Sequence, residues 1–108
     1  MKISKSGSVQ LPDAEMRILL SLLEKHLPGY TIYAFGSRAN GNTRATSDVD
    51  LLIRGEGPVD LSVLAELKAD LEEAEIEPRI DLVDWWKIDD EFRDAIWPNA
   101  LLVMEGRP

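Results

Sequence analysis

Two aspartates stand two residues apart at the start of an apolar run, where Asp48 and Asp50 lead into Leu51-Leu52-Ile53. Side chains at positions i and i+2 of a β-strand point to the same face, so a strand here would project both carboxylates together. Their like charges repel beside apolar residues unless a cation joins them, and Mg²⁺ prefers such hard oxygen ligands together with substrate phosphates. The pair therefore indicates a divalent-cation site. In the alternative, Asp48 caps the loop through an Asx turn and Asp50 lies at a solvated strand end.

A glycine and a serine, Gly36-Ser37, follow a β-branched and aromatic segment at 30–35. Glycine lets the backbone approach a phosphate closely, and the following amides and the Ser37 hydroxyl can donate to its oxygens. Arg38 and Arg44 lie in the same polar segment, where guanidinium groups could pair with a triphosphate or remain solvated. An ordinary strand-ending turn is the alternative for the glycine. Combined with the paired aspartates, these four residues predict a nucleotide-binding site.

A third acidic residue, Asp81, lies early in a predicted strand between Ile80 and Leu82. If that strand neighbours the first, Asp81 could lie beside Asp50. Asp84 is three residues further on and would face the opposite side, but it replaces Asp81 if the strand register differs. Asp81 is the first choice for the third carboxylate, and Asp84 stays open.

The stretch from 33 to 53 resembles the signature of the DNA polymerase β-like nucleotidyltransferases. That signature is Gly-Ser, ten residues and then Asp-x-Asp, and it is filled here by Gly36-Ser37 and Asp48-Val49-Asp50. The residues that follow the glycine and serine, together with the short chain, look most like the minimal nucleotidyltransferases. These include the antitoxins that are paired with HEPN toxins. The resemblance extends over nearly the whole chain.

The resemblance implies metal-dependent transfer of a nucleoside monophosphate, AMP from ATP, to a hydroxyl of another macromolecule. Asp48 and Asp50 would hold Mg²⁺, with two ions expected, and Asp81 would bind metal and deprotonate the acceptor hydroxyl. The chain has 108 residues, which leaves no room for an acceptor-binding domain. The acceptor is therefore expected on a separate chain, by resemblance a HEPN-type toxin that the modification silences.

Two other classes of function remain open. A non-catalytic antitoxin could neutralise its partner by binding and use the acidic residues only to sense nucleotide. A metal-dependent phosphatase or nuclease also clusters carboxylates, but Gly36-Ser37 is a phosphate cradle rather than a metal ligand and argues against this class.

Hydrophobic periodicity and chain breakers predict the elements that position these residues. The expected elements are a helix from Pro12 to Leu27, strands at 30–35 and 49–53, a helix at 60–74, a strand at 79–84, a short helix at 89–97 and a strand at 101–104. This order predicts an α/β (α+β) fold in which helices pack on a small mixed sheet of about four strands. One domain is expected over 1–108, with 1–10 as a flexible or edge lead-in.

The composition limits the partners. A net charge of −8 argues against a general nucleic-acid binder, although it permits a basic protein partner. The chain has no cysteine, which excludes thiolate metal sites. Residues 1–7 lack the apolar stretch expected of a signal peptide, and no apolar run approaches membrane-spanning length. A cytoplasmic protein is expected. Trp85, Trp86 and Trp97 are predicted to fill the core or an interface rather than stack on a base.

Overall fold

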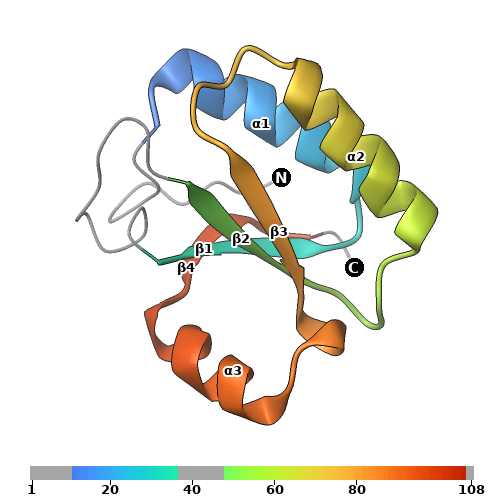
Figure 1. The fold of residues 1–108 in the computed structure, drawn as a ribbon, viewed down its shortest axis with the longest axis vertical. Coiled ribbons are helices and arrows are strands. Elements are labelled where there is room, and N and C mark those ends of the chain that lie inside the picture. The colour runs from blue at the N-terminus through green and yellow to red at the C-terminus, as the bar shows by residue number, and fades with distance from the viewer. Residues whose placement is uncertain (1–10, 37–47, 107–108) are drawn as a thin grey trace.

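The fold is a four-stranded sheet with two helices on one face and a third helix against the other (Figure 1). The computed structural model describes residues 11–36 and 48–106. In chain order the elements are α1 (Asp13–His26), β1 (Thr31–Phe35), β2 (Val49–Arg54), α2 (Leu61–Glu73), β3 (Ile80–Asp84), η1 (Trp85–Lys87), α3 (Asp90–Ile96), η2 (Trp97–Asn99) and β4 (Leu101–Met104), where η marks a 3-10 turn. The predicted fold class and element order are confirmed. The predicted lead-in at 1–10 lies outside the described residues.

The strand order is β3-β2-β1-β4, and the sheet is mixed. β1 runs antiparallel to β2 and β4, while β2 and β3 are parallel because α2 carries the chain back between them. The register pairs Phe35 with Asp50 and Asp50 with Asp81. The end of β1 and the starts of β2 and β3 therefore meet at one edge of the sheet.

The main core lies between the sheet and the two helices α1 and α2. Alternate residues of β2 point toward these helices, and Val49, Leu51 and Ile53 are buried against leucines such as Leu23 and Leu67. The intervening residues of β2 consequently point to the opposite face, which is where Asp50 lies. None of the helices in the described parts of the chain has the length and apolar character needed to cross a membrane.

A polar contact joins the end of α1 to α2 within the helix layer of the fold. His26 Nε2 lies 2.6 Å from Asp70 Oδ2, and Lys25 Nζ lies 3.5 Å from the same oxygen. The hydrogen bond from His26, followed by the charge of Lys25, holds the pKa of Asp70 below its ordinary value. These residues close α1 just before Thr31, at the start of β1.

The second face of the sheet carries an aromatic cluster formed around η1, α3 and η2. The Arg54 guanidinium lies 4.2 Å from the ring centroid of Trp85 and 4.4 Å from that of Trp97, so two indoles enclose one cation. Arg93 donates two hydrogen bonds to the Trp85 carbonyl. Trp86 is 47% exposed. Trp85 and Trp97 thus pack around Arg54, with Trp97 still 38% exposed, and Trp86 is the most exposed of the three tryptophans.

Candidate active site

The candidate site is built on the second face of the sheet, at the edge where β2 and β3 begin. Asp50 and Asp81 are direct partners in the parallel register and share one face. Asp48 is two residues before Asp50 and is half-buried. The backbone N–H of Val49 donates to the Arg79 carbonyl at 2.8 Å, which fixes the entry of both strands. The structure therefore brings Asp48, Asp50 and Asp81 to one place.

Asp84 lies elsewhere. It ends β3 with 6% exposure, and its carboxylate accepts hydrogen bonds from the Val59 N–H at 2.8 Å and the Trp86 N–H at 3.0 Å. Its side chain ties the loop before α2 to the turn after β3. Of the two acids left open by the sequence, only Asp81 is paired with Asp50.

Asp84→Ala should lower the free energy of unfolding by about 3 kcal/mol, because the buried Val59 N–H and the part-buried Trp86 N–H lose a charged acceptor. Asp60→Ala is the matched control, since Asp60 is exposed and its side chain makes no capping hydrogen bond. The control should change stability by less than about 1 kcal/mol. Urea denaturation of the two variants makes the comparison, and equal stabilities would contradict the structural role of Asp84.

Gly36 brings the end of β1 into contact with Asp50. Its φ is +82°, a left-handed conformation that glycine adopts without strain. A Cβ at this position would lie 2.6 Å from Asp50 Oδ2. The backbone at Gly36 is thus within reach of any phosphate or metal held by Asp50. The other predicted nucleotide-binding residues, Ser37, Arg38 and Arg44, lie outside the described residues.

Gly36→Ala should destabilise the protein by about 1–3 kcal/mol, because it forces a left-handed φ on alanine and pushes against the Asp50 carboxylate. Gly57→Ala serves as the control, since nothing lies within 4 Å of a Cβ added there. Thermal denaturation should show a clear loss for the first variant and almost none for the second. If both variants melt together, the close approach of Gly36 to Asp50 is wrong.

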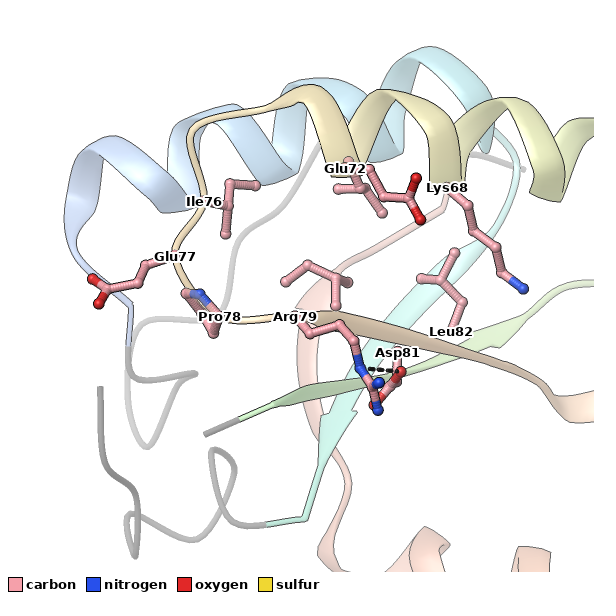
Figure 2. Close-up of a pocket in the computed structure, with 10 residues that line it drawn as sticks. Lys68, Glu72, Ile76, Glu77, Pro78, Arg79, Asp81 and Leu82 are labelled. Carbon is pink, nitrogen blue, oxygen red and sulfur yellow. Dashed lines mark hydrogen bonds and ion pairs between the residues drawn. The ribbon is translucent and has the colours of Figure 1, made fainter. Parts of the chain in front are cut away.

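One cation, Arg79, lies across two of the three carboxylates. Its Nη2 is 3.1 Å from Asp48 Oδ2 and 3.2 Å from Asp81 Oδ2, and its Nε is 3.2 Å from Asp81 Oδ1. Figure 2 shows Arg79 and Asp81 side by side, on the side of β3 turned away from α2. Arg79 was not among the site residues predicted from the sequence. The spacing in the sequence could have indicated Arg79, because a cation two residues before Asp81 on the same strand face is placed to pair with it.

The electrostatics single out Asp50. Burial raises the pKa of this carboxyl above its ordinary value, and the charges of Asp81 and Asp48 raise it further, while Arg79 opposes them. Asp50 is therefore the member of the group that most needs an added cation.

The donor set suits Mg²⁺ in kind, because three carboxylates share one sheet face and carboxylate oxygens are ligands that this cation prefers. Within residues 11–36 and 48–106, no three acidic or histidine side chains already stand in the arrangement of a metal site. In this arrangement Asp48 and Asp81 are paired with the Arg79 guanidinium. Asp48, Asp50 and Asp81 are thus the residues that could hold the metal after a side-chain rearrangement.

Two pockets adjoin this edge of the sheet. The larger, about 520 Å³, lies between α2 and β3 and has apolar residues such as Leu71 and Leu82 in its wall (Figure 2). It is on the side of β3 that faces α2, and Arg79 and Asp81 are the members of the site that help to line it. The smaller, about 320 Å³, is lined by Phe35, Gly36, Ala95, Ile96 and Asn99. Because it includes Gly36 and lies on the face that carries Asp50, the smaller pocket is the better placed for a ligand of the site.

Comparison with known proteins identifies the family of this chain. The family model described as Polymerase beta, Nucleotidyltransferase matches residues 19–107. The probable protein adenylyltransferase MntA of Haemophilus influenzae is 33% identical over 99 residues, which are 92% of this chain and 87% of that protein.

Solved structures share the fold. A crystal structure of a toxin-antitoxin with AMP-PNP superposes with a TM-score of 0.70 at 22% identity, over 85% of this chain and 74% of the other. A structure of a tri-AMPylated Shewanella oneidensis HEPN toxin in complex with MNT antitoxin gives a TM-score of 0.64 at 20% identity, over 85% and 71% of the two chains. The family predicted from the Gly-Ser and Asp-x-Asp pattern is confirmed: the chain belongs to the polymerase beta nucleotidyltransferase family and is a nucleotidyltransferase.

Proposed function

We propose that this chain transfers AMP from ATP to a hydroxyl side chain of a separate HEPN-type protein, in a reaction that depends on Mg²⁺. The observation that carries the proposal is the register that sets Asp50 against Asp81, with Gly36 in contact with Asp50. The names of the relatives support it, since one is a probable protein adenylyltransferase and another structure holds an AMPylated HEPN toxin with its antitoxin. Because ATP is the proposed donor of AMP, the proposed site of action is the cytoplasm.

Each residue has a distinct role in this reaction. The acceptor oxygen attacks the α-phosphorus, a new P–O bond forms, and the bond to the bridging oxygen breaks so that pyrophosphate leaves. Asp81 accepts the proton of the acceptor hydroxyl, while Asp48 and Asp50 would hold Mg²⁺ with it. When bound, Mg²⁺ neutralises the charge that develops on the phosphate oxygens. The Gly36 backbone and Ser37 would bind the phosphates, with Arg38 and Arg44 as further phosphate partners.

The partner is expected to supply the orientation of the acceptor. In-line attack requires the hydroxyl to be held close to the α-phosphorus. The described residues form one sheet with three helices, and none of these elements is a separate acceptor-binding unit. The chain alone should therefore transfer AMP slowly, and addition of the partner should raise the rate.

Two labelled substrates test the reaction class. The protein and its HEPN-type partner are incubated with Mg²⁺ and with ATP labelled in either the α- or the γ-phosphate. Label from the α-phosphate should appear on the partner, and label from the γ-phosphate should not. EDTA should prevent the transfer. Incorporation of the γ label would indicate a kinase and would overturn the proposal.

One observation favours a second candidate function. The positive charge of Arg79 already offsets the negative charges of Asp48 and Asp81. This arrangement would also suit an antitoxin that binds its partner and senses nucleotide without catalysing a reaction. The Asp48→Asn, Asp50→Asn double variant separates the two. If the chain is a non-catalytic antitoxin, this double variant should still inhibit the partner. If the chain is an adenylyltransferase, the double variant should fail to inhibit it.

A further inference from the structure

Arg79 engages three oxygens of two proposed metal ligands through a single guanidinium. It forms a two-pronged contact with Asp81, from Nε to Oδ1 and from Nη2 to Oδ2, both at 3.2 Å. The same Nη2 also reaches Asp48 Oδ2 at 3.1 Å. Such a planar fork matches a carboxylate in both geometry and charge. Asp50, by contrast, makes no hydrogen bond or ion pair with the described residues.

The backbone of Arg79 is held in place, whereas its side chain is largely exposed to solvent. Its carbonyl accepts the Val49 N–H at 2.8 Å, so the backbone is held beside the start of β2. The side chain is 73% exposed, and the carboxylates of Asp48 and Asp81 are 43% and 38% exposed. The guanidinium therefore lies on the solvent side of the carboxylates and can leave them without opening the core. Exposed ion pairs of this kind are weak enough to be exchanged.

The guanidinium and a divalent cation compete for these oxygens. Mg²⁺ binds a carboxylate oxygen at about 2.0–2.1 Å, which would bring it close to the N–H groups that contact the same oxygen. Arginine keeps its proton at any physiological pH, so the repulsion between the two cations cannot be relieved by deprotonation. This repulsion disfavours occupation of the oxygens by both cations at once.

We propose that Arg79 is an exchangeable counter-ion: it pairs with Asp48 and Asp81, a divalent cation that binds these carboxylates displaces it, and it therefore weakens cation binding in the absence of nucleotide. Arg79 is thus a positioning residue for the carboxylates. This inference rests on the proposed function, because it takes the three aspartates as the metal ligands. As a consequence, a divalent cation that binds the carboxylates replaces the positive charge of the Arg79 guanidinium instead of adding to it.

Titration with Mn²⁺ in the absence of nucleotide tests the exchange, with free Mn²⁺ measured by electron paramagnetic resonance. Arg79→Gln should bind Mn²⁺ about three- to tenfold more tightly than the wild type, because no internal cation competes. Lys25→Gln is the matched control. Lys25 is also an exposed cation paired with an aspartate, but it lies in the helix layer that covers the face of the sheet opposite Asp50 (Figure 1), so its loss should change the affinity by less than about twofold.

A second variant and a second readout keep the test decisive. Arg79→Lys retains the charge but loses the fork, so its affinity should lie between those of the wild type and Arg79→Gln. Mn²⁺ should also raise the melting temperature of Arg79→Gln more than that of the wild type. If Arg79→Gln and the wild type bind Mn²⁺ equally well, the exchange is wrong and the metal site stands. If neither binds Mn²⁺, the metal site of the proposed function fails as well.

Discussion

Asp50→Asn is expected to abolish AMP transfer, with a fall in rate of about a thousandfold or more. The substitution is nearly isosteric, but it removes the half-buried carboxylate that lies between Gly36 and Asp81 and is most in need of a cation. Loss of a metal ligand removes several kcal/mol of transition-state charge stabilisation. The rate at which the α-phosphate label reaches the partner measures the effect. Transfer at more than about a tenth of the wild-type rate would contradict the assignment of Asp50.

The same variant should be more stable than the wild type when divalent cations are removed. The folded-state pKa of Asp50 is raised by burial and by Asp81 and Asp48, so folding favours the protonated form of this group. Asp50 therefore stabilises the folded protein at pH values below its unfolded-state pKa, and this stabilisation is lost as the pH rises through its folded-state pKa. Asp50→Asn should therefore gain in melting temperature over the wild type at neutral pH in EDTA, and the gain should vanish in acid.

Asp60→Asn supplies the control for this comparison, because Asp60 is exposed and should show no such gain at any pH. An Asp50→Asn protein that is less stable than the wild type at neutral pH would support the alternative in which Asp50 has a structural role at the strand end.

Asp81→Asn should slow transfer by about 10²- to 10⁴-fold, the range expected for loss of a general base. Binding of ATP with Mg²⁺ should weaken much less, because Asp48 and Asp50 remain. Single-turnover rates with saturating nucleotide separate the two effects. Asp84→Asn is the matched control on the same strand, and its folded fraction should transfer at nearly the wild-type rate, since its carboxylate is bound to Val59 and Trp86.

The assignment of Asp81 would be overturned if both variants transferred at similar rates. If Asp84→Asn alone lost transfer while still folded, the other acid of β3 would take the role of base.

Much of the fold could be predicted because local signals agreed with one another. Leucines at helical spacing and the Pro28-Gly29 stop define α1, and β-branched and aromatic residues define β1. The shared face of Asp48 and Asp50 followed from the two-residue period of a strand alone. These features depend on neighbours in the sequence, which is why the sequence is sufficient for them.

Other features depend on contacts between distant segments. The choice between Asp81 and Asp84 is decided by the β2–β3 register, and a slip of one residue would reverse it. The bridge from Arg79 to Asp48 spans 31 positions and needs the same register. The turn of Gly36 onto Asp50 requires β1 and β2 to be paired. No local pattern carries this information.

The central claim is that the Asp48, Asp50 and Asp81 group transfers AMP to a partner protein. The most direct test is the intact mass of the HEPN-type partner after incubation with this chain, ATP and Mg²⁺. We expect the partner to gain the mass of one or more AMP units with the wild type and none with Asp50→Asn. A partner that is neutralised without any gain in mass, equally well by the wild type and by Asp50→Asn, would contradict the claim.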